Sequence, residues 1–284
     1  MAASVTDEQW NTVRESVRTT AGRFCELVAS VPHPTARASA KWSVADVAAH
    51  VTTIGFLNTM LLRVAQPPFH MPGLTEAIAA TTVDTVHGLN DQVMSHFLER
   101  DVTRLLDMLR HHVDLMLTAS QDRDPGETFS WLGEARPTLA GMLAHMVNEL
   151  LIHGNDIARA VKVPWAMPAE DAALFFDFFY VGLANGQKGR LLDGSKRPLQ
   201  RRIAVEFRSG YTTAVTIVVC DGQVTAEPVG PGADAWVRFD PATLNMMMFG
   251  RISKLQAVLT RKIIIGGRRP WLMPAFLRTV RLPS

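Results

Sequence analysis

The chain has 284 residues, of which 47% are hydrophobic, and its net charge is only +2. This hydrophobic share supports a sizeable core and excludes an intrinsically disordered protein. Residues 165–284 hold 16 Lys and Arg against 9 Asp and Glu, whereas residues 1–164 have a balance of −5. This excess of positive charge is too small, and tyrosine too scarce, for a nucleic-acid-binding protein. The uneven charge indicates two structural units with different surfaces.

The two cysteines, Cys25 and Cys220, lie far apart in the sequence. They provide neither a disulfide framework nor a pair of cysteine ligands for zinc. The N-terminus lacks the basic-then-apolar pattern of an export signal, and we expect no transmembrane segment of about 18 apolar residues. We therefore expect a cytoplasmic protein. The oligomeric state stays open, with a monomer as the default.

The first half of the chain has the periodicity of helices. A capping box at Thr6 opens a helix expected over residues 6–30, and another at Ser43 opens one over residues 43–66. The later helical segments are a weak one at 74–86, one long helix over 90–120, and a helix over 138–161. We predict that residues 1–164 fold as an antiparallel four-helix bundle.

After Pro164 the pattern changes. The expected elements are a helix over 168–192, strands at 203–207, 215–219 and 236–239, and a helix from Pro241 to Phe249. The strands alternate with period two, and Asp221-Gly222 after the second strand is a strong β-hairpin signal. We predict that residues 165–284 form a small α+β domain with an antiparallel sheet.

The chemically informative segment is LAHMVNELLIHGNDIARA, residues 143–160. Glu149 and His153 are four residues apart, so on a helix they share a face, close to the apolar side. His50 lies on the apolar face of the second predicted helix. Such side chains are costly in a bundle core unless a partner satisfies them, and a divalent metal would do so. The sequence therefore predicts a metal site formed by His50, Glu149 and His153.

Two histidines and one carboxylate leave one coordination position open, as in catalytic zinc sites. Zinc is our first choice, although nickel, iron or manganese also suits these ligands. His145 lies outside the apolar arc and stands about 12 Å along the helix axis from His153, so one ion cannot readily reach both. The alternative without a metal is that Glu149 and His153 form an ordinary polar pair on one helix.

The segment WSVADVAAH ending at His50, together with the segment around Glu149 and His153, resembles the mycothiol-dependent maleylpyruvate isomerase family. The resemblance spans roughly residues 5–165 and implies a DinB-like metal-binding bundle. It implies that His50, Glu149 and His153 bind a divalent metal, usually zinc. The stretch ADAWVRFDPATLNMMMFGRISK more weakly resembles a sterol-carrier-protein-like domain. Relatives of this type occur in actinobacteria that use mycothiol.

Three further residues are candidate parts of the site. Asp156 matches an Asp of the family and is expected to help hold the cofactor, by accepting a hydrogen bond from a ligand histidine. Arg238 and Arg251 are candidate catalytic residues, because the family carries an arginine in its second domain and arginine grips carboxylates bidentately. For each of these three residues, the alternative to a role in the site is an ordinary side chain exposed to solvent.

The resemblance implies a metal-dependent enzyme in which mycothiol attacks an electrophilic small molecule, with metal and mycothiol as cofactors. The outcome is an isomerisation, if the thiol is expelled again, or an S-transfer, if it stays attached. Two alternatives stay open. In the first, the protein is a hydrophobic-ligand or lipid carrier with a structural metal and a pocket around Met246, Met247 and Met248. In the second, it is a hydrolase that uses metal-activated water.

Overall fold

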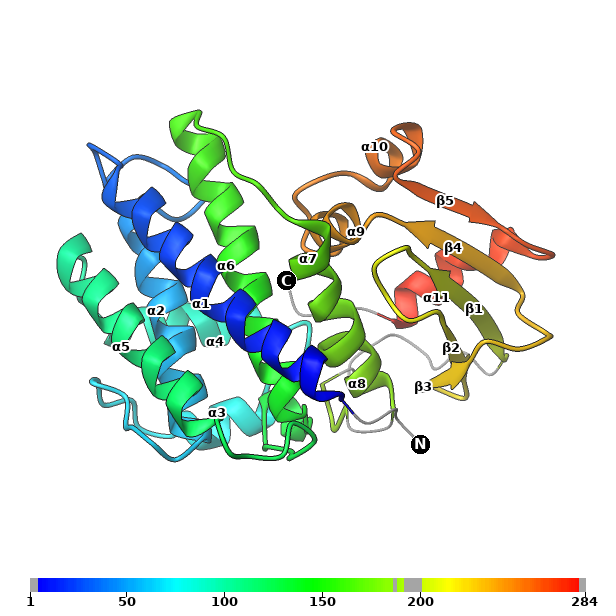
Figure 1. Cartoon of the computed structure of the whole chain (residues 1–284), viewed down its shortest axis with the longest axis horizontal. Coiled ribbons are helices and arrows are strands. Elements are labelled where there is room, and N and C mark those ends of the chain that lie inside the picture. Colours follow the sequence, from blue (N-terminus) through cyan, green and yellow to red (C-terminus); the bar gives the residue numbers. More distant parts are fainter. Residues whose placement is uncertain (1–4, 186–187, 192–200, 281–284) are drawn as a thin grey trace.

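The computed structural model describes residues 5–185, 188–191 and 201–280. It has a helical bundle on one side and a five-stranded sheet with helices on the other (Figure 1). A helical segment after the bundle lies between the two. The expected combination of a helical bundle and an α+β unit is therefore confirmed.

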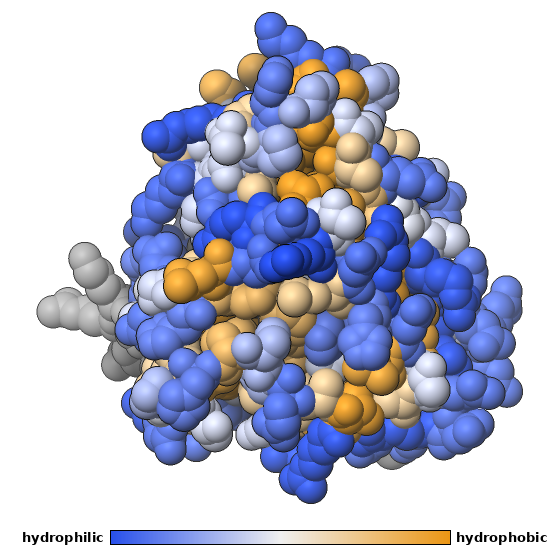
Figure 2. Space-filling view, turned by 90° about the vertical axis from the view of Figure 1, so that its left-hand side faces the viewer, coloured by the Kyte–Doolittle hydropathy of each residue, from blue (hydrophilic) through white to orange (hydrophobic). Residues whose placement is uncertain are grey.

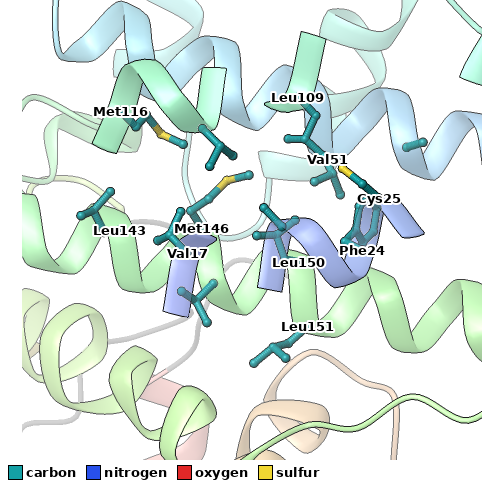
Figure 3. Packing of buried hydrophobic residues seen from close by; sticks show 14 of the residues in the cluster. Val17, Phe24, Cys25, Val51, Leu109, Met116, Leu143, Met146, Leu150 and Leu151 are labelled. Atoms are coloured by element: carbon teal, nitrogen blue, oxygen red, sulfur yellow. The ribbon is translucent and has the colours of Figure 1, made fainter. Parts of the chain in front are cut away.

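The four bundle helices are α1 (Asp7–Ala29), α2 (Val44–Leu61), α5 (Val102–Ala119) and α6 (Leu139–Val161). Helix α1 packs on α5 and α6, and α2 packs on the same two helices. Apolar side chains from all four interlock in the core (Figure 3). The capping boxes predicted at Thr6 and Ser43 are present, and each hydroxyl accepts a hydrogen bond from the backbone three residues later. These caps satisfy orphan amides and determine where α1 and α2 begin.

The single long helix predicted over residues 90–120 is wrong. The chain forms α4 (Val86–His96), then a break, and then α5; α3 (Leu74–Ala80) occupies most of the weak segment before them. Asp101 caps α5 by accepting a hydrogen bond from the Arg104 amide at 3.0 Å. Arg100 is held outside the helix by Asp46, with Nε 2.7 Å from its carboxylate. Leu98, which falls inside the predicted helix, lies in the break and is 78% exposed. Capping and this ion pair outweigh periodicity there.

Helix α2 qualifies by length and mean hydropathy, 1.2, as a membrane span, which the sequence prediction did not foresee. It is the one helix of the described residues that does so, and 72% of the span is buried within the protein. Its apolar character is that of a bundle core helix, surrounded by protein on most sides. Figure 2 shows the side of the molecule formed by the bundle, where hydrophilic residues cover most of the surface.

The helix predicted over 168–192 is shorter and changes its winding. It consists of α7 (Ala169–Leu174), the π-helical turn η2 (Phe175–Tyr180) and α8 (Val181–Ala184), and residue 192 lies outside the described residues. Phe175 and Phe179 pack on the bundle side with Trp131, whereas Phe176 packs in the sheet core with Phe207. The segment therefore joins both cores, and the predicted domain boundary after residue 164 stays a prediction.

The strands are β1 (Ile203–Arg208), β2 (Val215–Cys220), β3 (Gln223–Pro228), β4 (Ala235–Phe239) and β5 (Ile263–Gly266). Their order is β3-β2-β1-β4-β5. Asp221 and Gly222 both have positive φ, 49° and 73°, so the predicted hairpin turn between β2 and β3 is confirmed. The sheet is mixed rather than antiparallel throughout, because the chain returns from β3 to place β4 parallel to β1.

The remaining helices of the second unit are α9 (Pro241–Met248), α10 (Lys254–Leu259), the short η3 (Pro270–Leu272) and α11 (Met273–Thr279). Helix α9 begins at Pro241 as predicted, and Asp240 caps it by accepting a hydrogen bond from the Thr243 amide. It packs on both α7 and α6. The residues that follow α9 therefore lie against the bundle, where the predicted metal ligands are found.

Candidate metal centre

The structure brings His50 from α2 together with Glu149 and His153 from α6. One ligand atom of each residue lies within 4.8 Å of the other two. Glu149 Oε2 is 3.3 Å from His153 Nε2 and 3.7 Å from His50 Nε2. The side chains are only 5% (His50), 12% (Glu149) and 10% (His153) exposed. Two helices of the bundle thus direct three lone-pair donors at one buried point.

This donor set fits a divalent metal. An ion about 2.0–2.1 Å from each ligand atom would hold tetrahedral neighbours about 3.3–3.5 Å apart, close to the two shorter separations here. A buried carboxylate beside two imidazoles is also costly without a cation or protons to balance it. The spacing and the burial agree with the sequence prediction, and the nature of the ion stays open between zinc and the other metals that accept nitrogen and oxygen ligands.

His145 belongs to the site, although it is not one of the three clustered ligands. Its Nε2 lies 3.3 Å from Glu149 Oε1, whereas His50 and His153 pair with Oε2. Its ring packs against Trp131 and Phe179, at centroid distances of 5.1 and 4.9 Å. The helical wheel places His145 outside the apolar arc of its own helix. It cannot show that residues from a loop and from η2, distant in sequence, cover this side chain. It engages Oε1 and leaves Oε2 for a metal.

We predict that His145→Ala weakens metal binding by about tenfold or more, because outer partners of ligand carboxylates typically contribute 10–100-fold to metal affinity. His145→Gln retains a donor of similar reach and should recover part of this loss. Competition with a chromophoric chelator measures both affinities. Equal affinity in His145→Ala and the unsubstituted protein would contradict this positioning role.

Asp156 and Arg251 extend the site into the second unit. Asp156 Oδ2 lies 3.3 Å from Nδ1 of His153, without good hydrogen-bond alignment. Arg251, just after α9, grips the same carboxylate with two hydrogen bonds of 3.0 and 2.6 Å. Its third contact is a hydrogen bond to the Phe249 carbonyl. The ion pair therefore links Asp156, the neighbour of the candidate ligand His153 on α6, to the α+β unit.

The titratable groups of the cluster perturb one another strongly. Burial alone would raise the pKa of Glu149, but the imidazoles of His153 and His50 beside it outweigh burial and hold that pKa well below its usual range. Burial would lower the pKa of His153, but the carboxylates of Asp156 and Glu149 raise it. Burial lowers the pKa values of His50 and His145, and nearby histidines add to the effect. An ionised glutamate beside neutral His50 is the state that a cation requires.

The cluster opens into a cavity of about 300 Å³. Besides the cluster it is lined mainly by apolar side chains, among them Ile54, Leu57, Val86, Leu89, Trp131, Leu132, Ile152 and Phe249. The α4 residues Val86 and Leu89 were not predicted as site residues, because only the tertiary fold brings α4 to the site. A second, wider cavity of about 840 Å³ adjoins the first and shares Lys41, Trp42, His153 and Arg251 with it. The site can therefore take a mostly apolar group beside the metal ligands.

The structure does not bring Arg238 to this cavity. Arg238 is exposed on β4, on the face of the sheet opposite to its neighbours Val237 and Phe239, which point into the core. Cys25 is buried in the bundle core and Cys220 lies on β2. Neither cysteine lines the two cavities at the cluster. Of the two candidate arginines, only Arg251 reaches the site.

A family model and one solved structure agree with this architecture. A family model described as "Mycothiol maleylpyruvate isomerase N-terminal domain" matches residues 17–158, half of the chain. The crystal structure of a histidine-to-alanine mutant of the mycothiol-dependent maleylpyruvate isomerase is similar with a TM-score of 0.50 at 11% identity, covering 90% of this chain and 92% of that chain. Another crystal structure of the mycothiol-dependent maleylpyruvate isomerase gives 0.48 at 13% identity, covering 86% and 90%. Among curated protein sequences there is no significant match.

Proposed function

Because the chain belongs to the mycothiol maleylpyruvate isomerase N-terminal domain family, we propose that it is a metal-dependent enzyme acting through an external thiol. The thiol, mycothiol in this proposal, is the nucleophile that attacks an electrophilic small molecule. The reaction ends as an isomerisation if the thiol is expelled and as an S-transfer if it is retained. The single observation that carries the proposal is the buried His50–Glu149–His153 cluster at the wall of a largely apolar cavity.

A divalent cation at the cluster would supply Lewis acidity and lower the pKa of a thiol that reaches its open coordination position. The chain's own residues orient and shield that position. His145 holds one oxygen of Glu149, and Asp156 lies beside the far nitrogen of His153. The apolar wall formed by Leu57, Leu89 and other side chains excludes water and leaves room for the substrate.

The sulfur has to come from outside the chain. Cys25 is buried, and burial raises the pKa of its thiol; Cys220 lies on β2 in the sheet unit. Neither is in a position to act at the cluster. Arg251, which touches both cavities at the cluster, is the arginine that we propose for catalysis. Arg238 is not proposed for this role.

Cobalt substitution tests the thiol directly. Titrating mycothiol into cobalt-loaded protein should produce the intense near-ultraviolet band of thiolate ligation and release about one proton at neutral pH. A non-thiol analogue of mycothiol, in which a hydroxyl replaces the sulfhydryl, should give no such band. Glu149→Ala, which removes a ligand, should give neither band nor proton.

An unchanged spectrum at saturating thiol, with the metal still bound, would overturn the thiol proposal. Substrate consumption without thiol would then favour the hydrolase alternative, in which metal-activated water is the nucleophile. The distinction between isomerase and transferase follows from the product, since only S-transfer leaves a stable thiol adduct.

A second candidate function, a carrier of hydrophobic ligands, is favoured by one observation. A separate cavity of about 330 Å³ lies between η2, α9 and the sheet. Met247 and Met248 line it together with Phe176, Phe207 and Leu244. Methionines adapt to apolar ligands of varied shape. Under this alternative a solvatochromic fatty-acid probe binds equally well to the protein with and without metal.

A further inference from the structure

The surface of the second unit has an unusual charge distribution. Residues 241–284 contain 8 Lys and Arg and no Asp or Glu. Some of these cations are paired, such as Arg251 with Asp156 and Arg269 with Asp234. Arg261 and Arg268 are exposed and have no acidic partner among the described residues. The segment therefore presents uncompensated positive charge to solvent.

Large apolar side chains are exposed on the same segment. The described residues include eleven exposed large hydrophobics, and six of them fall between residues 255 and 271. They are Leu255, Val258, Leu259, Ile264, Ile265 and Trp271. Leu259, Trp271 and Leu255 are 72%, 69% and 68% exposed. Scattered single apolar residues need no explanation, whereas large exposed apolar patches are typical of interaction sites.

The fold puts these residues at the margin of the molecule. Helix α10 packs on α9 and β5, mainly through the buried Ala257, and its remaining apolar side chains face solvent. Strand β5 is an edge strand of the sheet. Figure 1 shows α10 and β5 together along the border of the sheet unit, away from the bundle. We call α10, β5 and η3, together with the turns that join them and their exposed residues, the α10–β5 face.

We propose that the α10–β5 face binds the surface of an anionic lipid bilayer. Bilayer interfaces accept leucine, isoleucine and tryptophan side chains at the level of the headgroups, while lysine and arginine are attracted to anionic lipids. The α10–β5 face supplies both components within residues 255–271. A second copy of the chain is a poor occupant, because two such faces would repel each other by like charge. Nucleic acid is also a poor fit, since the exposed side chains are aliphatic apart from Trp271 and offer little base stacking.

Vesicle binding tests the proposal. The full chain should sediment with vesicles of equimolar phosphatidylcholine and phosphatidylglycerol, and much less with phosphatidylcholine alone. High salt should weaken the binding, because screening reduces the attraction of exposed charges. Brominated lipid should quench part of the tryptophan fluorescence, and Trp271→Phe should lose that quenching.

Two matched pairs of variants locate the contact. Arg261→Glu with Arg268→Glu should weaken binding at least about 30-fold, since each cation near the bilayer contributes about fivefold. Leu255→Ser with Leu259→Ser should also weaken it. The controls are Arg110→Glu and Leu98→Ser, an exposed cation and an exposed leucine of the bundle, which should leave binding unchanged.

Several results would overturn the proposal. These are no sedimentation with anionic vesicles at low salt, no quenching by brominated lipid, or equal losses in the bundle controls. Binding to DNA or self-association that depends on the same arginines, without vesicle binding, would assign the α10–β5 face to another partner. The charge variants alter only exposed side chains, so they decide the question even if the leucine variant is unstable.

Discussion

His153→Ala protein purified without chelator should contain almost no divalent metal, whereas the unsubstituted protein should contain about one ion per chain. His153 Nε2 lies 3.3 Å from Glu149 Oε2, and both side chains are buried with His50 at a single point. Removing one of three ligands should weaken binding by well over a hundredfold, more than the 10–100-fold typical of supporting residues. Elemental analysis measures the metal content of each protein. His50→Ala should lose its metal in the same way as His153→Ala.

His112 provides the matched control for this experiment. It is another buried histidine of the bundle, but its Nδ1 lies 2.9 Å from the Thr59 hydroxyl, and burial lowers its pKa to about 4. His112→Ala should lose stability through the cavity that it leaves and still retain the metal. If His153→Ala and His50→Ala keep their metal, the assignment of the centre is wrong.

Arg251→Ala should lower the free energy of unfolding by about 3 kcal/mol. The substitution leaves the carboxylate of Asp156, which is only 9% exposed, without its bidentate partner. The expected loss of unfolding free energy is large because an unpaired buried charge destabilises the fold far more than the loss of a surface ion pair does. Metal affinity should also fall, by about tenfold, because Asp156 lies beside the Nδ1 of His153. Denaturant unfolding and chelator competition measure the two effects.

Arg238→Ala is the natural comparison, since Arg238 is an exposed arginine of the same unit. It should change stability by less than about 0.5 kcal/mol. Asp156→Ala combined with Arg251→Ala should cost less than the sum of the single losses, because the double variant leaves no buried charge unpaired. Equal stabilities of Arg251→Ala and Arg238→Ala would mean that the ion pair does not join the two units.

The elements that the sequence predicted well are those with local signals. Helices α1 and α2 begin at the capping boxes of Thr6 and Ser43, and the Asp221-Gly222 hairpin forms as expected. The failures have causes that are wholly or partly non-local. The break before α5 combines the local cap of Asp101 with the contact of Arg100 to Asp46, 54 positions away, and the parallel pairing of β4 with β1 depends on the order of the whole sheet. No periodicity within one segment records such contacts.

The candidate site divides in the same way. Spacing by four placed Glu149 and His153 on one helix face, because helix geometry alone relates such side chains. The apolar pattern of α2 placed His50 on the core-facing side of its own helix, and the packing of α2 on α6 brought it to Glu149. Only the tertiary structure decided that Arg251, and not Arg238, reaches Asp156. It also decided that His145 lies against Glu149, since the Trp131 and Phe179 rings that enclose it come from a loop and from η2. A helix determines which residues share its face, whereas the packing of other elements determines what that face meets.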